Sequence, residues 1–288
     1  MRVLAVLVVS LIALAVVEDW PQAASVSRRD GRITVIVGES GESIPSPRLF
    51  MMDADGKNLR GRGGYVTYAS LSPDGRRIAY DSLAARDARV LAADAVRPRG
   101  RVLVKSGGHV DWSPNGRAIA FVRYRNGCCT RGDIWVESFT SRKQRQVVRN
   151  GDWPDWSPDG KRLAFVRSRD SDASSSSGRD IWAVDLASKR TRRLIRGADS
   201  PRWSPDGRRI AFTRWDSFDS FIYVAHADGT EPRRVVAADT AAWSPDGSEL
   251  AIANFNRIVR IRPDGTHRRV VWAPKGGCPA CRDLDWSR

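Results

Sequence analysis

The sequence predicts an all-β fold, a six-bladed β-propeller of four-stranded blades, from three observations. A short turn motif recurs at a regular period, each period holds four strand-like runs, and one copy of the motif is divided between the two ends of the chain. The copies begin 41, 44, 47, 40 and 43 residues apart, at Leu71, Trp112, Trp156, Trp203, Trp243 and Trp286. Periods of about 40 to 45 residues are typical of propeller blades.

Each copy opens with a turn that its residue types favour. In the fourth copy, Ser204, Pro205 and Gly207 occupy the first, second and fourth positions of a type I turn, where these residues are preferred. Trp203 precedes the turn, and residues 210–212 (Ile-Ala-Phe) follow it as a short apolar strand. A two-stranded hairpin is marginally stable alone, so we expect the copies to assemble with further strands.

Two more strands complete each unit. An apolar run such as DIWAVD at 180–185 follows each turn, and an Arg-rich run such as RRLI at 192–195 comes after it. Every unit therefore has the Trp strand first, the Ile-Ala-Phe strand second, the Ile-Trp-Val strand third and the Arg-rich strand last.

The two chain ends together supply the sixth blade. From Asp30-Gly31 onward, RITVIV and RLFMMDADGKNLR match the second, third and fourth strands of a unit. Residues 285–288 match a first strand with nothing after it. We expect the ring to close by pairing this C-terminal strand with the N-terminal strands in a composite blade, which removes the open edge between first and last blades.

Residues 1–24 are predicted to be a secretory signal peptide, and residues 25–288 the propeller. Arg2 is followed by an apolar run at 3–17, which is short for a bilayer span and typical of a signal core. Cleavage after Ala23-Ala24 or at the earlier Ala13-Leu14-Ala15 stays open. We expect export to the periplasm or the cell exterior, with no membrane span after signal removal; an uncleaved leader would instead anchor the N-terminus.

The chain is strongly basic, with a formal charge of +15 from 48 Lys and Arg against 33 Asp and Glu. This charge fits an anionic polymer, a membrane surface or nucleic acid, or else a coding bias toward Arg at exposed positions. Nothing along the chain resembles a recognition helix, a zinc finger or an aromatic RNA-binding signature, so nucleic acid is not the expected partner.

The repeats resemble the WD-like repeats of the TolB β-propeller family. The resemblance rests on the aromatic-Ser-Pro-Asp-Gly turn, the Ile-Ala-Phe strand and the Ile-Trp-Val-x-Asp strand, and it covers nearly everything after the leader. It implies the propeller fold. TolB itself carries an α/β domain before its propeller, and we expect none here because the leader runs almost directly into strand residues at Ile33.

The first-strand Trp residues are expected to pack as wedges between blades. Burying a Trp hides roughly 200 Å², worth at most about 5 kcal/mol. Stacking of one or two of them on a carbohydrate is the alternative. The residues concerned are Trp112, Trp156, Trp203, Trp243 and Trp286.

The predicted topology separates two faces. The loops between strands one and two and between strands three and four lie on one face, called the turn face, which should be markedly basic. The remaining loops lie on the opposite face, called the mouth face, where the chain approaches the central channel before each Trp strand. Candidate binding residues there are His109, Asp111, Asp152, Asp155, Asp199, Asp239, Asp283 and Asp285.

Several carboxylates around one channel could bind a cation, a basic peptide segment or a sugar. The alternative is that each Asp accepts hydrogen bonds from turn amides at the start of its own strand. We assign no catalytic residue, no metal ligand and no cofactor, and a cation at the channel mouth stays open.

Four cysteines, Cys128, Cys129, Cys278 and Cys281, are predicted to form two disulfides, as expected of an exported protein. Their pairing is open. Cys278 with Cys281 is locally easy, a bond between the neighbours Cys128 and Cys129 is strained, and cross-pairing needs the second-blade loop to fold over the channel. A four-Cys zinc site is an alternative, and a redox pair is less supported because no helix follows.

The expected function is an exported interaction module, a monomer that binds a protein or a cell-envelope polymer without catalysis. The sequence has no Gly-x-Ser-x-Gly elbow, and its three histidines, His109, His226 and His267, fall on different blades. The alternative is a propeller-based hydrolase or lyase acting on a polysaccharide or peptide at the channel mouth, with His109 paired to Asp111 or Asp152.

Overall fold

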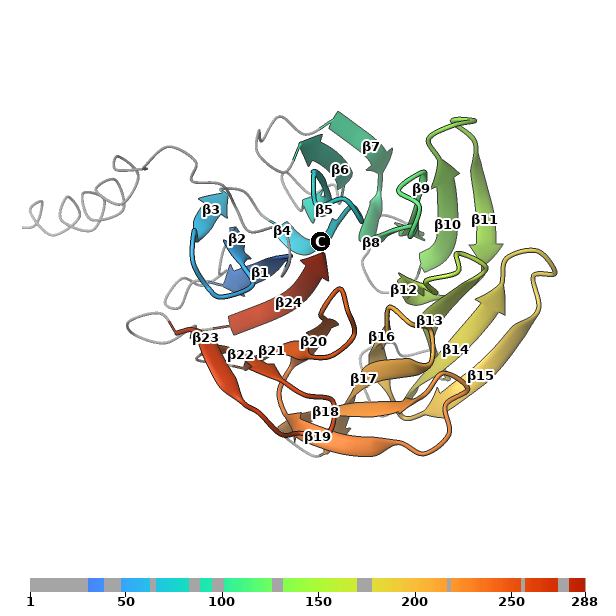
Figure 1. Ribbon diagram of the computed structural model, residues 1–288. Helices are drawn as coiled ribbons and strands as arrows, with labels where there is room; N and C mark the ends of the chain where they lie inside the picture. Colours follow the sequence, from blue (N-terminus) through green and yellow to red (C-terminus); the bar gives the residue numbers. More distant parts are fainter. Residues whose placement is uncertain are drawn as a thin grey trace, which may run out of the picture.

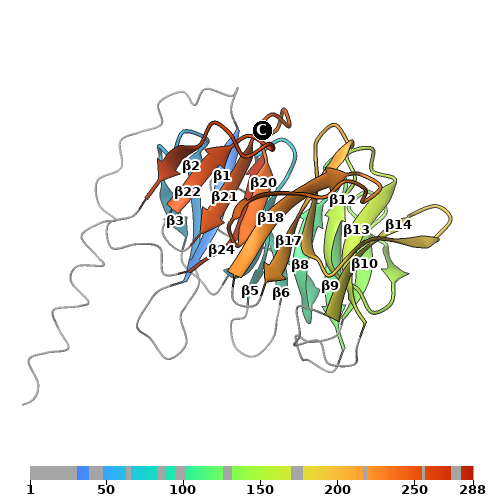
Figure 2. The same ribbon diagram turned by 90° about the horizontal axis from the view of Figure 1, so that it is seen from below.

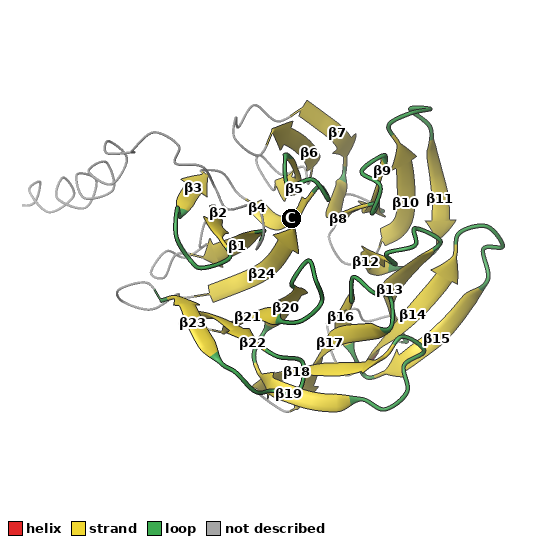
Figure 3. Ribbon diagram, in the orientation of Figure 1, coloured by secondary structure: helices red, strands yellow, loops and turns green. Residues whose placement is uncertain are grey.

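Six four-stranded antiparallel sheets are arranged as blades around a central axis in the computed structural model (Figure 1). The structure describes residues 31–38, 48–62, 66–82, 89–94, 101–125, 132–169, 178–216, 219–254, 257–273 and 280–287. These residues form strands, turns and loops with no α-helix among them (Figure 3). The predicted all-β six-bladed propeller is confirmed.

The first three blades follow the chain in order, and each runs from an inner strand to an outer one. The first contains β4 (Val66–Leu71), β5 (Arg77–Ser82), β6 (Arg89–Asp94) and β7 (Arg101–Lys105). The second contains β8 (Gly107–Trp112), β9 (Ala118–Tyr124), β10 (Gly132–Ser138) and β11 (Gln144–Val148). The third contains β12 (Asp152–Trp156), β13 (Arg162–Ser168), β14 (Arg179–Asp185) and β15 (Thr191–Arg196).

The remaining blades complete the ring. The fourth contains β16 (Asp199–Trp203), β17 (Arg209–Asp216), β18 (Asp219–His226) and β19 (Arg233–Ala237). The fifth contains β20 (Thr240–Trp243), β21 (Leu250–Asn254), β22 (Arg257–Ile261) and β23 (Arg269–Trp272). The composite blade contains β24 (Ala280–Ser287), β1 (Arg32–Gly38), β2 (Arg48–Asp53) and β3 (Arg60–Arg62). Figure 2 shows the blades from the side.

The ring closes as predicted, by pairing of the two ends of the described chain. Strand β24 runs antiparallel to β1, with Ile33 opposite Trp286 and Val35 opposite Leu284. All four of these side chains are buried. Closure therefore leaves no open sheet edge between the first and composite blades.

Each Ser-Pro-Asp-Gly turn is held by its own side chains. In the fourth blade, the Ser204 hydroxyl donates to Asp206 at 2.5 Å and accepts from the Arg209 N–H at 2.9 Å. Gly207 donates its N–H to the Ser204 carbonyl at 2.8 Å and has a φ of 68°, a backbone conformation that glycine adopts without strain. The motif is thus a local structural unit.

The Trp residues lie at the joints between blades. Trp112, Trp203, Trp243 and Trp286 are 4 to 6% exposed. A guanidinium group lies over each of these rings, and for Trp112 it comes from Arg77 of the preceding blade, 4.5 Å from the ring centroid. Arg77 also donates to the carbonyl of Gly116 at 3.0 Å. Some of the Arg side chains on the turn face therefore stabilise the contacts between neighbouring blades.

The third-blade Trp differs from the others. Trp156 is only half-buried, whereas Trp112, Trp203, Trp243 and Trp286 are buried. The indole N–H of Trp156, like that of Trp203, is buried without a hydrogen-bond partner. The position that carries Arg77 in the first blade carries Ala118 in the second, so no guanidinium group reaches Trp156 from there. The joint between the second and third blades lacks this repeated contact.

Some expectations fall outside the described residues. The predicted signal peptide at 1–24 lies there, as do Cys128, Cys129 and Cys278, and the side chain of Cys281 is not described either. The disulfide pairing therefore stays a prediction. Within the described ranges, no helix is long and apolar enough to cross a membrane.

Candidate functional site

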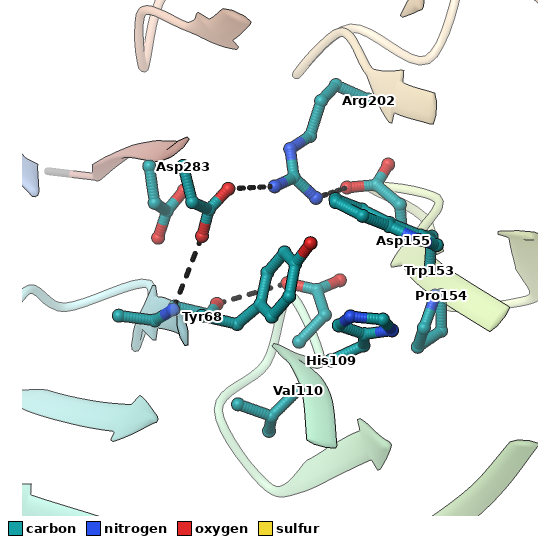
Figure 4. A pocket seen from close by; sticks show the side chains of 12 residues that line it. Tyr68, His109, Val110, Trp153, Pro154, Asp155, Arg202 and Asp283 are labelled. Atoms are coloured by element: carbon teal, nitrogen blue, oxygen red, sulfur yellow. Dashed lines mark hydrogen bonds and ion pairs between the residues drawn. The ribbon is translucent and has the colours of Figure 1, made fainter. Parts of the chain in front are cut away.

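A small cavity lies at the channel, where the inner strands of five of the six blades meet (Figure 4). Its volume is about 30 Å³, enough for about two water molecules. One side of the lining is aromatic and the other is charged. The lining residues are Tyr68, Ala69, Ser70, His109, Val110, Asp111, Trp153, Pro154, Asp155, Arg202, Asp283 and Asp285.

Irregular inner strands position the aromatic side chains. The strand register shifts between Gly108 and Asp111 in the second blade and between Asp152 and Asp155 in the third. Within these shifts, His109 has a φ of 46° and Trp153 a φ of 52°. A left-handed backbone at a bulky residue costs about 1 to 3 kcal/mol, and such residues cluster at functional sites.

Three aromatic rings from consecutive blades pack together at the cavity. Tyr68 meets His109 edge to face at a centroid distance of 4.0 Å and meets Trp153 at 4.6 Å. The His109 and Trp153 rings are also 4.6 Å apart. Tyr68, His109 and Trp153, here called the aromatic triad, each stand three residues before the Trp position of their repeat, which is occupied by Leu71 in the first blade.

Two carboxylates hold His109. Its Nδ1 is hydrogen-bonded to Oδ1 of Asp152, and its backbone N–H donates to Oδ2 of Asp81 at 3.3 Å. Burial lowers the pKa of His109, but the negative charges of Asp152, Asp81 and Asp283 outweigh it and leave the pKa above its ordinary value. The site therefore stabilises the imidazolium form relative to a free histidine.

Asp81 was not among the sequence-predicted residues, although it organises the aromatic triad. Its Oδ1 accepts hydrogen bonds from the Thr67 N–H, the Thr67 hydroxyl and the Tyr68 N–H, at 3.0, 2.7 and 2.5 Å. Burial raises its pKa despite these bonds. The signal available in the sequence was a carboxylate in the Ile-Ala-Tyr-Asp strand, where other copies have an apolar residue or Thr.

Arg202 is the central cation of the charged side. Its Nη2 lies 3.0 Å from Oδ1 of Asp283, and its Nη1 lies 3.7 Å from Oδ1 of Asp155. Burial lowers the pKa of Arg202, but the surrounding carboxylates raise it further, so the guanidinium stays charged. Arg202 was missed because it occupies the position where the second, third and composite blades carry Asp111, Asp155 and Asp285.

The carboxylic acids around Arg202 are shifted toward their neutral forms. Burial raises the pKa of Asp111 to about 7 and that of Asp283 to about 6. Burial also raises the pKa of Asp155 well above its ordinary range, with the charge of Asp111 adding to the shift, and raises that of Asp285. One guanidinium faces four carboxyl groups, so their burial and mutual repulsion favour the protonated form more than in a free Asp.

All four of these carboxylates also connect neighbouring blades. Asp283 accepts the Ala69 N–H at 3.3 Å. Asp111 accepts the Trp156 N–H at 2.8 Å, Asp155 accepts the Trp203 N–H at 2.6 Å, and Asp285 accepts the Leu71 N–H at 2.6 Å. Each bond runs to the inner strand of the next blade. These bonds between blades differ from the expected alternative of bonds to amides of the same strand, although Asp285 also accepts the N–H of Trp286 in its own strand at 2.9 Å.

The other predicted residues lie around this centre. Asp152 and Asp199 do accept N–H groups at their own strand starts, from Trp153 and Ser200. Asp199 also pairs with Arg179 at 2.5 Å. Asp239 accepts from Ser220 at 2.5 Å and does not line the cavity. Within the described ranges, no three His, Cys, Asp or Glu side chains are grouped as a metal site.

A sequence model of the TolB beta propeller domain matches residues 109–271, which is more than half of the chain. The chain belongs to the TolB β-propeller domain family. Among curated proteins, none matches its sequence significantly.

Solved structures share the fold of this TolB-type propeller. TolB from Acinetobacter baumannii is 18% identical with a TM-score of 0.74, over 89% of this chain and 66% of that one. The putative TolB from Agrobacterium tumefaciens is 18% identical with a TM-score of 0.64, over 90% and 99% of the two chains. Hydrazine synthase of Kuenenia stuttgartiensis is 17% identical with a TM-score of 0.55, over 85% and 81%.

At these levels of sequence identity, the comparisons show a shared fold and nothing further. The TolB-type propeller also spans just under two thirds of the length of the Acinetobacter protein. Its function therefore has to be argued from its own channel residues.

Proposed function

We propose that this TolB-type propeller is an exported, non-catalytic binding module whose channel mouth binds a protein or cell-envelope polymer. The observation that carries the proposal is the aromatic triad. Three consecutive blades bring Tyr68, His109 and Trp153 into mutual contact, two of them on a left-handed backbone, beside buried carboxylates. Aromatic side chains near a surface are the residues that most often anchor a partner.

The size of the cavity supports binding at the mouth over enclosure of a substrate. Pockets that enclose small molecules measure about 300 to 1,000 Å³. The cavity here measures about 30 Å³. A partner would therefore contact the rim of the channel and send at most one small group inward.

The charges of the channel favour a cationic group on that partner. Seven carboxyl groups stand against two guanidinium groups and one imidazole. An aromatic ring beside carboxylates is a favourable site for a Lys or Arg side chain. The groups counted are Asp81, Asp111, Asp152, Asp155, Asp199, Asp283, Asp285, Arg179, Arg202 and His109.

Affinity capture with matched Trp variants tests this proposal. The immobilised full chain is exposed to an envelope extract, and the bound material is compared with that captured by Trp153→Ala and Trp215→Ala. Trp215 is half-exposed at the end of β17, on the mouth face but outside the cavity lining. A ligand retained by Trp215→Ala and lost by Trp153→Ala supports binding at the channel mouth. Equal capture by both variants contradicts it.

Export is part of the proposal and is supported by the apolar run at 3–17 behind Arg2. We expect the mature protein outside the cytosol, with a new N-terminus near residue 25 or an uncleaved leader. Recovery from the cytosol with Met1 still in place would contradict it.

The second candidate function, a hydrolase or lyase at the channel mouth, is favoured by one observation. The hydrogen bond between His109 and Asp152 fixes the imidazole as in acid–base pairs of enzymes. A screen with glycans, polyuronides and peptides, with His109→Ala as the control, decides between the candidates. Turnover that disappears in His109→Ala would establish the enzyme and refute the binding module.

A further inference from the structure

Six exposed basic side chains gather on the turn face of the second and third blades. Two come from the turns after β8 and β12, and four come from the loops between β10 and β11 and between β14 and β15. They are Arg117, Arg142, Lys143, Lys161, Lys189 and Arg190, here called the basic patch.

Backbone contacts make the basic patch continuous. The Phe139 N–H donates to the Arg117 carbonyl at 2.9 Å, and the Leu186 N–H donates to the Lys161 carbonyl at 2.9 Å. These bonds join the two loops within each blade. Arg145 joins the blades, since its Nη1 donates to the Leu186 carbonyl at 3.2 Å.

The positive charge of the basic patch is largely uncompensated. Among the described residues, none of its six side chains forms an ion pair. The neighbouring Asp159 and Asp185 accept hydrogen bonds from the Ser157 hydroxyl, the Lys161 backbone N–H and Ser188, and their two negative charges leave the six cations of the basic patch in excess. The second blade has Asn115 where the other Ser-Pro-x-Gly turns carry Asp, so it builds its turn without a negative charge.

The described chain begins on this same face. Arg32 at the start of β1 donates from Nη1 to the Gly75 carbonyl in the first-blade turn at 3.4 Å, and Gly31 accepts the Ala54 N–H at 3.3 Å. Residues 18–30 link this point to the apolar run at 3–17. Thirteen residues span at most about 45 Å when extended.

We propose that the turn face docks on an anionic phospholipid surface through the basic patch, which leaves the mouth face directed away from the bilayer. An apolar segment and a basic cluster on one side of a protein are the two signals that together give stable attachment to such a surface. The occupant argued here is the bilayer, because the basic patch is complementary to anionic headgroups and the described chain begins on the same face, at Gly31, after a sequence that includes the apolar run at 3–17.

Vesicle co-sedimentation of the full chain tests the proposal. Phosphatidylcholine vesicles with and without about 30% phosphatidylglycerol are compared, because the apolar run contributes equally to both and the ratio reports the charge alone. We expect tighter binding to the anionic vesicles, and we expect the difference to vanish at about 0.5 M NaCl.

Two triple variants locate the effect. Lys143→Gln, Lys161→Gln and Lys189→Gln together should weaken the phosphatidylglycerol-dependent affinity by about fivefold for each Lys, or about a hundredfold in all. The matched control removes three exposed charges from the mouth face, at Arg149, Arg196 and Arg257, and should change it by less than about twofold. A third variant, with the three Lys changed to Arg, should retain binding.

Three outcomes overturn the proposal. The first is equal binding to both kinds of vesicle. The second is an equal loss in the patch and mouth-face variants, which would reflect net charge alone. The third is patch-dependent binding to soluble polyphosphate without any preference for anionic vesicles, which would assign the basic patch to a soluble polyanion.

Discussion

Replacing Arg202 by Met removes the central cation of the channel while keeping a side chain of similar length. The guanidinium lies 3.0 Å from the carboxylate of Asp283 and 3.7 Å from that of Asp155. Asp283 is 3% exposed and Asp155 is 8% exposed. Removing one partner of a buried ion pair usually costs about 3 to 5 kcal/mol, because the other charge stays buried. We expect a loss of this size in the free energy of unfolding of Arg202→Met near neutral pH.

The same variant should show a pH dependence of defined sign. The pKa of Asp283 is raised from 3.8 to about 6 and that of Asp111 to about 7, so the folded state holds these protons more tightly than the unfolded state does. The contribution of these two carboxyl groups to the free energy of unfolding is therefore greatest below about pH 4. It falls as the pH rises through the folded pKa values, by about 3 kcal/mol for Asp283 alone. Loss of Arg202 raises these pKa values further and should deepen the fall.

Urea unfolding at about pH 5 and about pH 8 measures the effect. Arg202→Met should be close to the wild type at the lower pH and several kcal/mol less stable at the higher one. Adding Asp283→Asn should recover part of the loss, because a neutral amide needs no counter-charge. The electrostatic argument would be refuted by an equal loss at both pH values, which would indicate lost packing instead.

Three further substitutions test other contacts. Trp203→Ala should lower the free energy of unfolding by about 3 to 5 kcal/mol in urea, because its ring is 6% exposed; a loss below about 1 kcal/mol would contradict a role as a wedge. Asp152→Asn should lower the pKa of His109 measured by NMR, since it removes the first carboxylate that raises it, and an unchanged pKa would contradict that cause. Ala118→Arg should stabilise the protein by about 0.5 to 1 kcal/mol by placing a guanidinium over Trp156, which thermal unfolding would detect, and a lower Tm would count against the proposed stacking.

The fold could be predicted from the sequence because local and long-range signals agree. The Ser-Pro-Asp-Gly turn specifies its own hairpin, and its period counts the blades. The split motif at Trp286 and Gly31 even locates the closure, since Trp286 pairs with Ile33 in the structure. Each of these signals is read directly along the chain.

The channel could be predicted only in part. Asp111, Asp155, Asp283 and Asp285 were predicted from their place in the repeat, shortly before the Trp, and they do line the cavity. Arg202 was missed because its charge departs from the repeat, and its meaning depends on carboxylates from other blades. Contacts across the ring cannot be read from one repeat.

Of the aromatic triad, His109 was among the predicted residues and lines the cavity, whereas Tyr68 and Trp153 were missed. The three share one repeat position but differ in type, so the repeat period alone does not group them. The left-handed φ values of His109 and Trp153 place them at the channel, and they arise from shifts in strand register that no residue pattern announces. The role of the numerous Arg residues was harder still to predict, because some of them stack on Trp rings between blades.

The composite blade has a consequence for how the protein forms. Strand β1 is among the earliest parts of the propeller to be synthesised, yet its partner β24 ends at Ser287. A sheet that joins segments so far apart in sequence is slow to form, because a long stretch of chain must first be ordered. The ring therefore cannot close until nearly the whole chain is available, and loss of the last eight strand residues should leave five blades and an open edge ready to pair with another chain.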